Sequence, residues 1–413
     1  MKITLVNTDD SSGGAAVACR RLMYALNTQD KIKAQLLAQK GKIKDDNIQH
    51  IATNKIKEAK ALANIALERL AFKPYHNGEI NSFYFAPANI GMDISNLQVI
   101  KDADIIHLHW INLGFLSIKS LKQLAALNKP IVWTLHDMWA FTGGCHYSGD
   151  CTNYLNKCGN CERFLKKPSE NDLSRKINLS KSFFKNFNFV TCSHWLKDEA
   201  LKSSLLRDAT VISIANPIDT NFFQPLDKKA SRKALNLKDE VQYILFGAAN
   251  LNDDRKGLKY LLEAIELLAQ NENSKSIELL LFGKANKDEL NIPMKINELG
   301  SISSMKKMRD VYNAADLFII PSLQDNLPNT IMESMACGTP VVGFNTGGIP
   351  EMIDHKENGY IASYKDAKDL VNGIFHTLDH QIEFGKSARK KVLENYTEDK
   401  VAKKYIEFYQ SIM

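Results

Sequence analysis

Short runs of β-branched and other apolar residues alternate with helical stretches along almost the whole chain. This alternation is typical of parallel β-sheets whose strands are joined by crossover helices. The predicted strands cover residues 2–7, 104–108, 131–135, 189–192 and 211–214 in the first half, and residues 243–246, 277–282, 317–320, 340–344 and 360–362 in the second. The pattern therefore predicts an α/β chain with two Rossmann-like, doubly wound parallel sheets.

A length of 413 residues is large for a single hydrophobic core and favours more than one domain. Residues 216–240 contain Pro217, Pro225 and a charge-rich tail without a strand pattern, so we interpret them as the linker. We expect an N-terminal domain at residues 1–218 and a second domain at residues 219–390. Residues 391–413 are expected to form a helix that packs back on the first domain.

Charge and hydropathy exclude several classes of protein. The net charge of +6 is mild and spread along the sequence, so no nucleic-acid partner is expected. The first residues, MKITLVNTDD, hold only a short apolar run before two aspartates, which is too brief for a secretory leader. A run of about 18 apolar residues, as a spanning helix needs, does not occur. We therefore expect a cytoplasmic protein.

The segment KIKEAKALANIALERLAFK, residues 55–73, predicts an amphipathic helix with lysines around its apolar face. Two interpretations are open. Such a helix can lie on an anionic membrane, which would bring the protein to the cytoplasmic face of the inner membrane. It can equally be an ordinary surface helix packed on its own domain.

The most informative stretch is residues 321–353, PSLQDNLPNTIMESMACGTPVVGFNTGGIPEMI. A predicted strand ends near Ile320, a polar loop carries Asp325, and a helix with Glu333 opens close to Thr330. The loop amides, Asn329 at the helix start and the positive helix end suit an anionic group. A carboxylate one turn into the helix can accept hydrogen bonds from both ribose hydroxyls.

A second loop follows at once, in which Gly347 and Gly348 allow a ligand to approach the backbone closely. In this order the motif resembles retaining glycosyltransferases of family 4, which have the GT-B fold. The family's signature of two acids separated by seven residues reads Asp325-NLPNTIM-Glu333 here, followed by SMACGTPVV and Gly347-Gly348-Ile349-Pro350-Glu351.

The resemblance implies two Rossmann-like domains that face an interdomain cleft. It also implies that Glu333 holds the nucleotide ribose and that the first acid lies against the transferred sugar. Asp325 stands where the family has a glutamate, and its side chain is one methylene shorter, so its reach falls by about 1.5 Å.

A cationic segment, Asp254-Arg255-Lys256-Gly257, precedes a predicted helix and suits a clamp for a diphosphate. The resemblance assigns Lys256 to the donor diphosphate. The arginine that the family carries six positions earlier is Asn250 here, and Arg255 is the nearest substitute.

In the first domain, Gly13 and Gly14 precede a predicted helix and suit the approach of a phosphate or a sugar, although the full G-x-G-x-x-G fingerprint of dinucleotide oxidoreductases is absent. Histidines end two neighbouring strands, at His107 with His109 and at His136. By resemblance His136 touches the donor sugar and ranks first, His109 ranks second, and His107 is as readily a satisfied polar residue of the sheet.

Four of the seven cysteines lie close together in the sequence, with the spacing Cys145-x5-Cys151-x6-Cys158-x2-Cys161. Reduced thiols at this density suit a tetrahedral structural zinc site, and the alternative is free or redox-active thiols. The sole Asp-x-Asp, at residues 102–104, runs directly into a strand, so we interpret it as a turn. We expect no catalytic metal, as the resemblance to GT-B enzymes also implies.

The predicted function is transfer of a sugar from a UDP- or GDP-sugar to a saccharide or polyprenyl-linked acceptor, with retention at the anomeric carbon, in the synthesis of a bacterial surface polysaccharide. His136, Asp325 and Lys256 are the predicted catalytic residues. The alternatives are a nucleotide-sugar 2-epimerase on the same fold and a non-catalytic sugar-nucleotide-binding protein. Both rank lower because His136 and Lys256 accompany the ribose motif.

Overall fold

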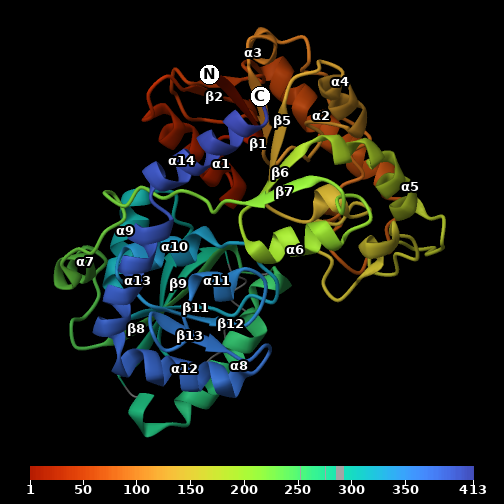
Figure 1. Ribbon diagram of the computed structural model, residues 1–413. Coiled ribbons are helices and arrows are strands. Elements are labelled where there is room, and N and C mark those ends of the chain that lie inside the picture. The colour runs from red at the N-terminus through yellow and green to blue at the C-terminus, as the bar shows by residue number, and fades with distance from the viewer. Residues whose placement is uncertain (252, 275, 285–292) are drawn as a thin grey trace. The chain divides into compact units, whose positions relative to one another are not determined.

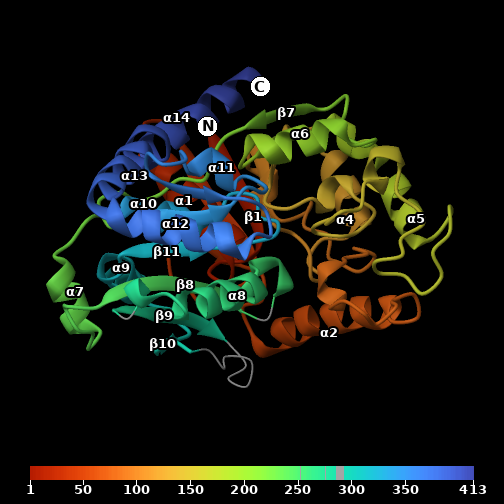
Figure 2. The ribbon, with the colours of Figure 1, turned by 90° about the horizontal axis from the view of Figure 1, so that it is seen from below.

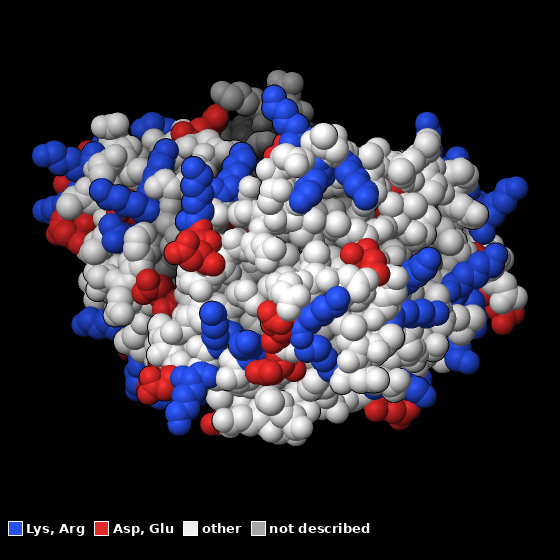
Figure 3. Space-filling model, turned by 90° about the horizontal axis from the view of Figure 1, so that it is seen from above, with Lys and Arg blue, Asp and Glu red and all other residues white. Residues whose placement is uncertain are grey.

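The computed structural model describes residues 1–251, 253–274, 276–284 and 293–413. The chain forms two compact units, of which unit 1 comprises Met1–Pro217 with Val401–Met413 and unit 2 comprises Ile218–Lys400. Among the helices of these described ranges, none combines the length and the apolar character needed to cross a bilayer. On the face in Figure 3, Lys and Arg side chains are interspersed with Asp and Glu.

Unit 1 is built on a seven-stranded parallel sheet with the order β3-β2-β1-β4-β5-β6-β7. Its strands are β1 (Lys2–Asp9), β2 (Lys33–Lys40), β3 (Ile48–His50), β4 (Ile105–Leu108), β5 (Ile131–Leu135), β6 (Asn188–Thr191) and β7 (Thr210–Ser213). Its helices are α1 (Gly14–Asn27), α2 (Lys55–Phe72), α3 (Gln98–Lys101), α4 (Ile118–Ala125), α5 (Leu173–Ser180) and α6 (His194–Lys202). The 3-10 helices are η1 (Ser82–Tyr84), η2 (Trp139–Phe141), η3 (Asn153–Asn156) and η4 (Ser182–Asn186).

Unit 2 is built on a six-stranded parallel sheet with the order β10-β9-β8-β11-β12-β13. Its strands are β8 (Gln242–Asn250), β9 (Ile277–Lys284), β10 (Ile296–Gly300), β11 (Leu317–Ile320), β12 (Val341–Phe344) and β13 (Gly359–Ala362). Its helices are α7 (Lys228–Ala234), α8 (Leu258–Ala269), α9 (Met305–Ala314), α10 (Asn329–Ala336), α11 (Ile349–Met352), α12 (Ala367–Asp379) and α13 (Gln381–Asn395), with the 3-10 helices η5 (Asp254–Lys256) and η6 (Glu272–Ser274).

The strand order confirms two doubly wound parallel sheets. In unit 1 the direction of winding reverses between β1 and β4, and in unit 2 it reverses between β8 and β11. At such a switch point the loops after two adjacent strands diverge to opposite faces of the sheet and leave a crevice at their carboxyl ends, where ligands bind in open α/β folds. A ligand-binding site is therefore expected at the loops after these four strands.

Three strands lie outside the predicted set, namely β2, β3 and β10. Two of them, β3 and β10, are edge strands, and the residues of β10 are at least partly exposed. The segment interpreted as a linker is also more ordered than predicted. It forms α7, and its Arg232 is buried with an ion pair of 2.8 Å to Asp316.

The chain returns to unit 1 at Val401. Residue 391, where the predicted C-terminal segment begins, lies inside α13 of unit 2, and the neighbouring Val392 is buried there. The last helix, α14 (Glu398–Ser411), then lies against the sheet of unit 1, as Figure 1 shows. Its Tyr405 and Tyr409 are buried and form hydrogen bonds to Thr134 (2.9 Å) and His107 (2.7 Å). This helix therefore supports the strands whose ends carry the histidines of the site.

Candidate functional site

An ion pair crosses the switch point of unit 2. Lys256, which follows β8, places its Nζ 2.5 Å from Oδ2 of Asp325, which follows β11. The side chains are 26% and 12% exposed, respectively, so the pair is largely shielded from water. Attraction between charges is stronger in such a setting than on the surface. The structure thus brings together two of the three residues predicted to be catalytic.

Backbone packing fixes the loop that carries Asp325. Gly348 donates its N–H to the carbonyl oxygen of Asp325 at 3.0 Å. Gly347 has a φ of +58°, and a Cβ on it would lie 2.0 Å from the same oxygen. On the other side, Gly257 has a φ of +69° and its Cβ would lie 1.8 Å from the carbonyl oxygen of Pro321. Only glycine is compatible with these close approaches, so the loops after β8, β11 and β12 hold one another.

Glu333 lies one turn into α10, which begins at Asn329. It is 9% exposed, and its Oε2 accepts a hydrogen bond of 2.9 Å from the hydroxyl of Tyr312 on α9. Tyr312 was not among the residues predicted from the sequence, because nothing in its local pattern distinguishes it from a core aromatic. The hydrogen bond restricts the orientation of the glutamate before any ligand is present.

Arg255 lies beside Lys256, and its contact with the donor diphosphate stays a prediction. Its guanidinium forms an ion pair of 2.6 Å with Asp253, two residues earlier, and its carbonyl oxygen accepts a hydrogen bond of 2.7 Å from Leu323. The side chain is 22% exposed. As placed, Arg255 stabilises the loop beside Lys256, and Asn250 ends β8 nearby.

In unit 1, the loop after β1 leads to Gly13 at the N-cap of α1. Gly13 has a φ of +88°, and a Cβ on it would meet nothing within 4 Å. Gly14 is the first residue of the helix. The backbone at this helix start therefore faces open space, as the approach of a phosphate or sugar group requires.

The two predicted histidines meet at the ends of β4 and β5. Nδ1 of His109 lies 2.9 Å from Nε2 of His136. Burial lowers the pKa of His136 to about 4, and burial with the nearby His107 and His136 lowers the pKa of His109 well below its usual value. Both rings are therefore neutral at pH 7, and one donates to the other. Burial also lowers the pKa of His107 to about 3, and this residue is a satisfied polar group of the sheet.

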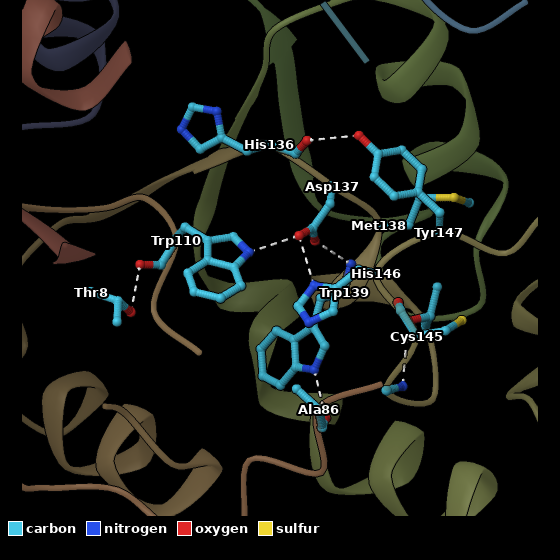
Figure 4. A network of polar contacts seen from close by, with 12 residues as sticks. Thr8, Ala86, Trp110, His136, Asp137, Met138, Trp139, Cys145, His146 and Tyr147 are labelled. Atoms are coloured by element: carbon cyan, nitrogen blue, oxygen red, sulfur yellow. Dashed lines mark hydrogen bonds and ion pairs between the residues drawn. The ribbon is translucent and has the colours of Figure 1, made fainter. Parts of the chain in front are cut away.

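Asp137, next to His136, is the centre of a hydrogen-bond network that the sequence did not predict (Figure 4). Its carboxylate accepts hydrogen bonds from Nε1 of Trp110 (2.9 Å), Nδ1 of His146 (2.7 Å) and the backbone N–H of Trp139 (2.8 Å). Burial acts to raise its pKa, but the His146 charge and these hydrogen bonds outweigh it and lower the pKa. The network fixes the backbone that follows β5 and so helps to orient His136.

Known protein families match both units of the chain. The family model described as Glycosyltransferase Family 4 matches residues 12–222, which is more than half of the chain, and the one described as Glycosyl transferases group 1 matches residues 242–380. The chain belongs to glycosyltransferase family 4. It is a glycosyltransferase, and the two parallel sheets described above are those of the GT-B fold.

Relatives of this family 4 enzyme include the putative colanic acid biosynthesis glycosyl transferase WcaC of Escherichia coli, which is 25% identical over 370 residues, or 85% of this chain and 84% of WcaC. The N-acetyl-alpha-D-glucosaminyl L-malate synthase of Bacillus anthracis is 22% identical over 356 residues, or 82% and 84% of the two chains. Among solved structures, sucrose-phosphate synthase from Thermosynechococcus elongatus has a TM-score of 0.69 at 18% identity and covers 99% of this chain and 98% of its own. HepE of Anabaena in complex with UDP-glucose has a TM-score of 0.65 at 16% identity, with full coverage of both chains.

The structural zinc site predicted for the four clustered cysteines of this family 4 enzyme stays a prediction. Among the residues that the structure describes, no group of three His, Cys, Asp or Glu side chains could hold a metal ion. Cys145 and Cys161 pack against the small cluster around Phe72, Phe85 and Phe164, whereas Cys158 packs against the main core of unit 1.

A cavity of about 730 Å³ opens beside the Lys256 loop of unit 2. Its walls include Asp254, Gly257 and Leu323, but not Lys256, Asp325 or Glu333. We therefore place the candidate site at the carboxyl ends of β8, β11 and β12, where the polar groups converge, and not in this cavity.

Proposed function

We propose that this glycosyltransferase transfers a hexose-type sugar from a UDP- or GDP-sugar to a saccharide or polyprenyl-linked acceptor, with retention at the anomeric carbon. It does so in the cytoplasm, in the synthesis of a bacterial surface polysaccharide such as capsule, O-antigen or exopolysaccharide. Unit 2 binds the donor and unit 1 the acceptor. The observation that best supports this proposal is the Lys256–Asp325 ion pair at the switch point of unit 2, with Glu333 on the adjoining helix.

Each group has a role that its chemistry suits. Glu333, oriented by Tyr312, accepts hydrogen bonds from the ribose hydroxyls. The Lys256 ammonium has three N–H donors, of which the pair with Asp325 uses one, and it stabilises the charge that develops on the departing diphosphate. Asp325 accepts hydrogen bonds from the transferred sugar. In unit 1, neutral His136 and His109 bind hydroxyl groups, and Gly13 and Gly14 let a substrate approach the backbone.

The proposed reaction is a front-face displacement. The bond between the anomeric carbon and the phosphate oxygen breaks while the acceptor oxygen bonds to the same face of that carbon. The proton of the acceptor hydroxyl passes to the departing phosphate oxygen. Lys256 lowers the barrier because it stabilises this oxygen more in the transition state than in the ground state. A cation in this position takes the part that a divalent metal plays elsewhere, so we expect activity to persist in EDTA.

Two of the relatives support the substrates proposed. WcaC is named for colanic acid biosynthesis, and HepE was solved with UDP-glucose. The test is to incubate the enzyme with UDP- and GDP-sugars and a pool of lipid-linked acceptors, and to identify products by mass spectrometry and their anomeric configuration by NMR. The expected product carries one added sugar in the donor's own configuration. An inverted linkage would contradict the mechanism, and conversion of the donor without acceptor would indicate an epimerase.

A further inference from the structure

Helix α2 packs on unit 1 through one narrow stripe of its surface. The ring of Phe72 stacks on that of Phe85, with centroids 4.7 Å apart and the planes 2° from parallel. Glu68 accepts a hydrogen bond of 2.9 Å from the N–H of Ala88, and Asn64 donates one of 3.1 Å to the carbonyl oxygen of Gly114. The buried residues of this 18-residue helix are Ala61, Glu68 and Phe72. The helix is therefore firmly docked, although little of its surface is covered.

Four large apolar side chains of α2 are exposed, namely Ile56 (81%), Leu62 (63%), Leu67 (51%) and Leu70 (65%). We call them the α2 outer face. Because successive residues of an α-helix are about 100° apart, Ile56, Leu67 and Leu70 point roughly opposite to the buried stripe, and Leu62 lies at the edge of the same face. An ordinary surface helix turns its apolar side to the core. Helix α2 has the reverse arrangement, and Figure 2 shows it along the outside of unit 1.

Basic and aromatic side chains surround the α2 outer face. Lys55, Lys57 and Lys60 are exposed in the first turns of the helix, and Lys73 is exposed just after its end. Two exposed rings, Tyr75 (51%) and Phe83 (48%), adjoin the same end, where the guanidinium of Arg69 lies 5.4 Å from the Phe83 ring centroid. Apolar side chains flanked by lysines and aromatic rings are typical of helices that lie in the interface of an anionic membrane.

We propose that the α2 outer face binds the surface of an anionic phospholipid membrane. Ile56, Leu67 and Leu70 enter the boundary between head groups and acyl chains, and the lysines lie among the lipid phosphates. The charge of the helix selects this occupant. A second copy of the chain would bring two rows of lysines against each other, whereas an anionic bilayer neutralises them.

The test measures co-sedimentation of the full chain with vesicles of phosphatidylglycerol and phosphatidylcholine, and with vesicles of phosphatidylcholine alone. The wild-type chain is expected to bind the anionic vesicles and to be released by salt, since the lysine contribution is screened. The triple variant Ile56→Gln/Leu67→Gln/Leu70→Gln is expected to bind at least about tenfold more weakly. The variant Lys55→Gln/Lys57→Gln/Lys60→Gln is expected to lose about tenfold as well, and mainly at low salt.

A matched control replaces three other exposed apolar residues of the chain, in the variant Met305→Gln/Ile382→Gln/Leu393→Gln. This variant is expected to bind vesicles like the wild type. All variants are checked for folding by circular dichroism and for UDP-sugar binding, which none should change, so membrane binding is read separately from the transferase reaction.

Three outcomes would overturn the proposal. The first is a wild-type chain that does not bind anionic vesicles or binds neutral ones equally well. The second is a triple variant of the α2 outer face that binds as the wild type does. The third is a wild-type dimer in sedimentation velocity that this triple variant abolishes, because that result would assign the face to a second copy.

Discussion

Nζ of Lys256 lies 2.5 Å from Oδ2 of Asp325, and the two residues follow the strands on either side of the switch point in unit 2. The ion pair therefore connects the two loops between which a ligand would bind. In family 4 the first acid of the motif is usually a glutamate. The shorter aspartate of this chain is held in place by the lysine, by a 3.5 Å contact from Ser322 and by the backbone N–H of Asn326 at 3.1 Å.

We predict that Lys256→Met lowers kcat/KM by about 10²- to 10³-fold, the scale of losing one donor that stabilises a developing negative charge. Lys256→Arg should retain more activity because the charge remains. Lys259→Met is the matched control, since Lys259 is 78% exposed and its contact with Glu263 is 3.9 Å. Steady-state kinetics with the cognate donor provides the measurement. If Lys256→Met and Lys259→Met had equal kcat/KM values, the diphosphate role of Lys256 would be refuted.

The Glu333–Tyr312 hydrogen bond leads to a prediction for nucleotide binding. Glu333→Ala should weaken the binding of UDP or GDP by about 1–3 kcal/mol, the scale of losing charged hydrogen bonds. Tyr312→Phe should weaken it by about 0.5–1.5 kcal/mol, because the carboxylate is then less well oriented. Isothermal titration calorimetry measures both. The control Glu357→Ala removes an exposed glutamate and should leave the dissociation constant unchanged. An unchanged dissociation constant for Glu333→Ala would contradict the assignment of Glu333 to the ribose.

Much of the fold was predictable because most buried strands appear as short apolar runs between helices. The edge strands β3 and β10 were not predicted, since Ile48–His50 is only three residues long and Ile296–Gly300 contains only two apolar side chains. Within the site, the motif gave Glu333 and Asp325. It could not give Tyr312 or Asp137, because their roles depend on contacts between elements far apart in the sequence. The zinc site that the cysteine spacing predicts stays a prediction.

The buried histidines of unit 1 predict acid sensitivity. Burial lowers the pKa of His107 to about 3 and that of His136 to about 4, from ordinary values near 6.5. Below pH 6.5 the unfolded chain therefore binds protons that the folded unit does not, so the free energy of unfolding falls as the pH falls. The loss is about 1.4 kcal/mol per pH unit for each histidine until its folded pKa is reached.

Urea unfolding followed by tryptophan fluorescence isolates this effect, because the four tryptophans, Trp110, Trp133, Trp139 and Trp195, all belong to unit 1. Between pH 6.5 and 5 the wild type should lose about 2 kcal/mol for each such histidine. His107→Gln should be less stable than the wild type at pH 7. Its free energy of unfolding should depend less steeply on pH, because the unfolded variant binds about one proton fewer than the unfolded wild type. A pH dependence equal to that of the wild type would contradict the burial of a neutral His107.

The four-cysteine region can be tested without an activity assay. If the structural zinc site predicted from the spacing is present, the purified protein should contain one equivalent of zinc, and a chelator should lower its melting temperature. Elemental analysis and calorimetry measure these two quantities. The zinc should be lost in Cys158→Ser, whereas a zinc-free wild type with an unchanged melting temperature would refute the site and leave the thiols as packing groups.

Gly347→Ala tests whether the loop after β12 positions Asp325. At a φ of +58° an alanine pays about 1–2 kcal/mol for the left-handed conformation, and its Cβ would in addition lie 2.0 Å from the carbonyl oxygen of Asp325. The loop must therefore shift and move Asp325 away from Lys256. Gly300→Ala is the matched control in the same unit, because Gly300 has a φ of +66° and its Cβ would meet nothing within 4 Å.

Both alanine variants should be less stable than the wild type, because alanine is strained in the left-handed conformation. Gly347→Ala should lose further stability, because its Cβ also meets the carbonyl oxygen of Asp325. It should also lower kcat/KM by at least about tenfold, because a displacement of roughly 1 Å at a reacting group can cost about 10² in rate. Thermal unfolding by circular dichroism and steady-state kinetics measure the two effects. Equal losses of stability and activity in both variants would mean that the contact between Gly347 and Asp325 does not position the acid.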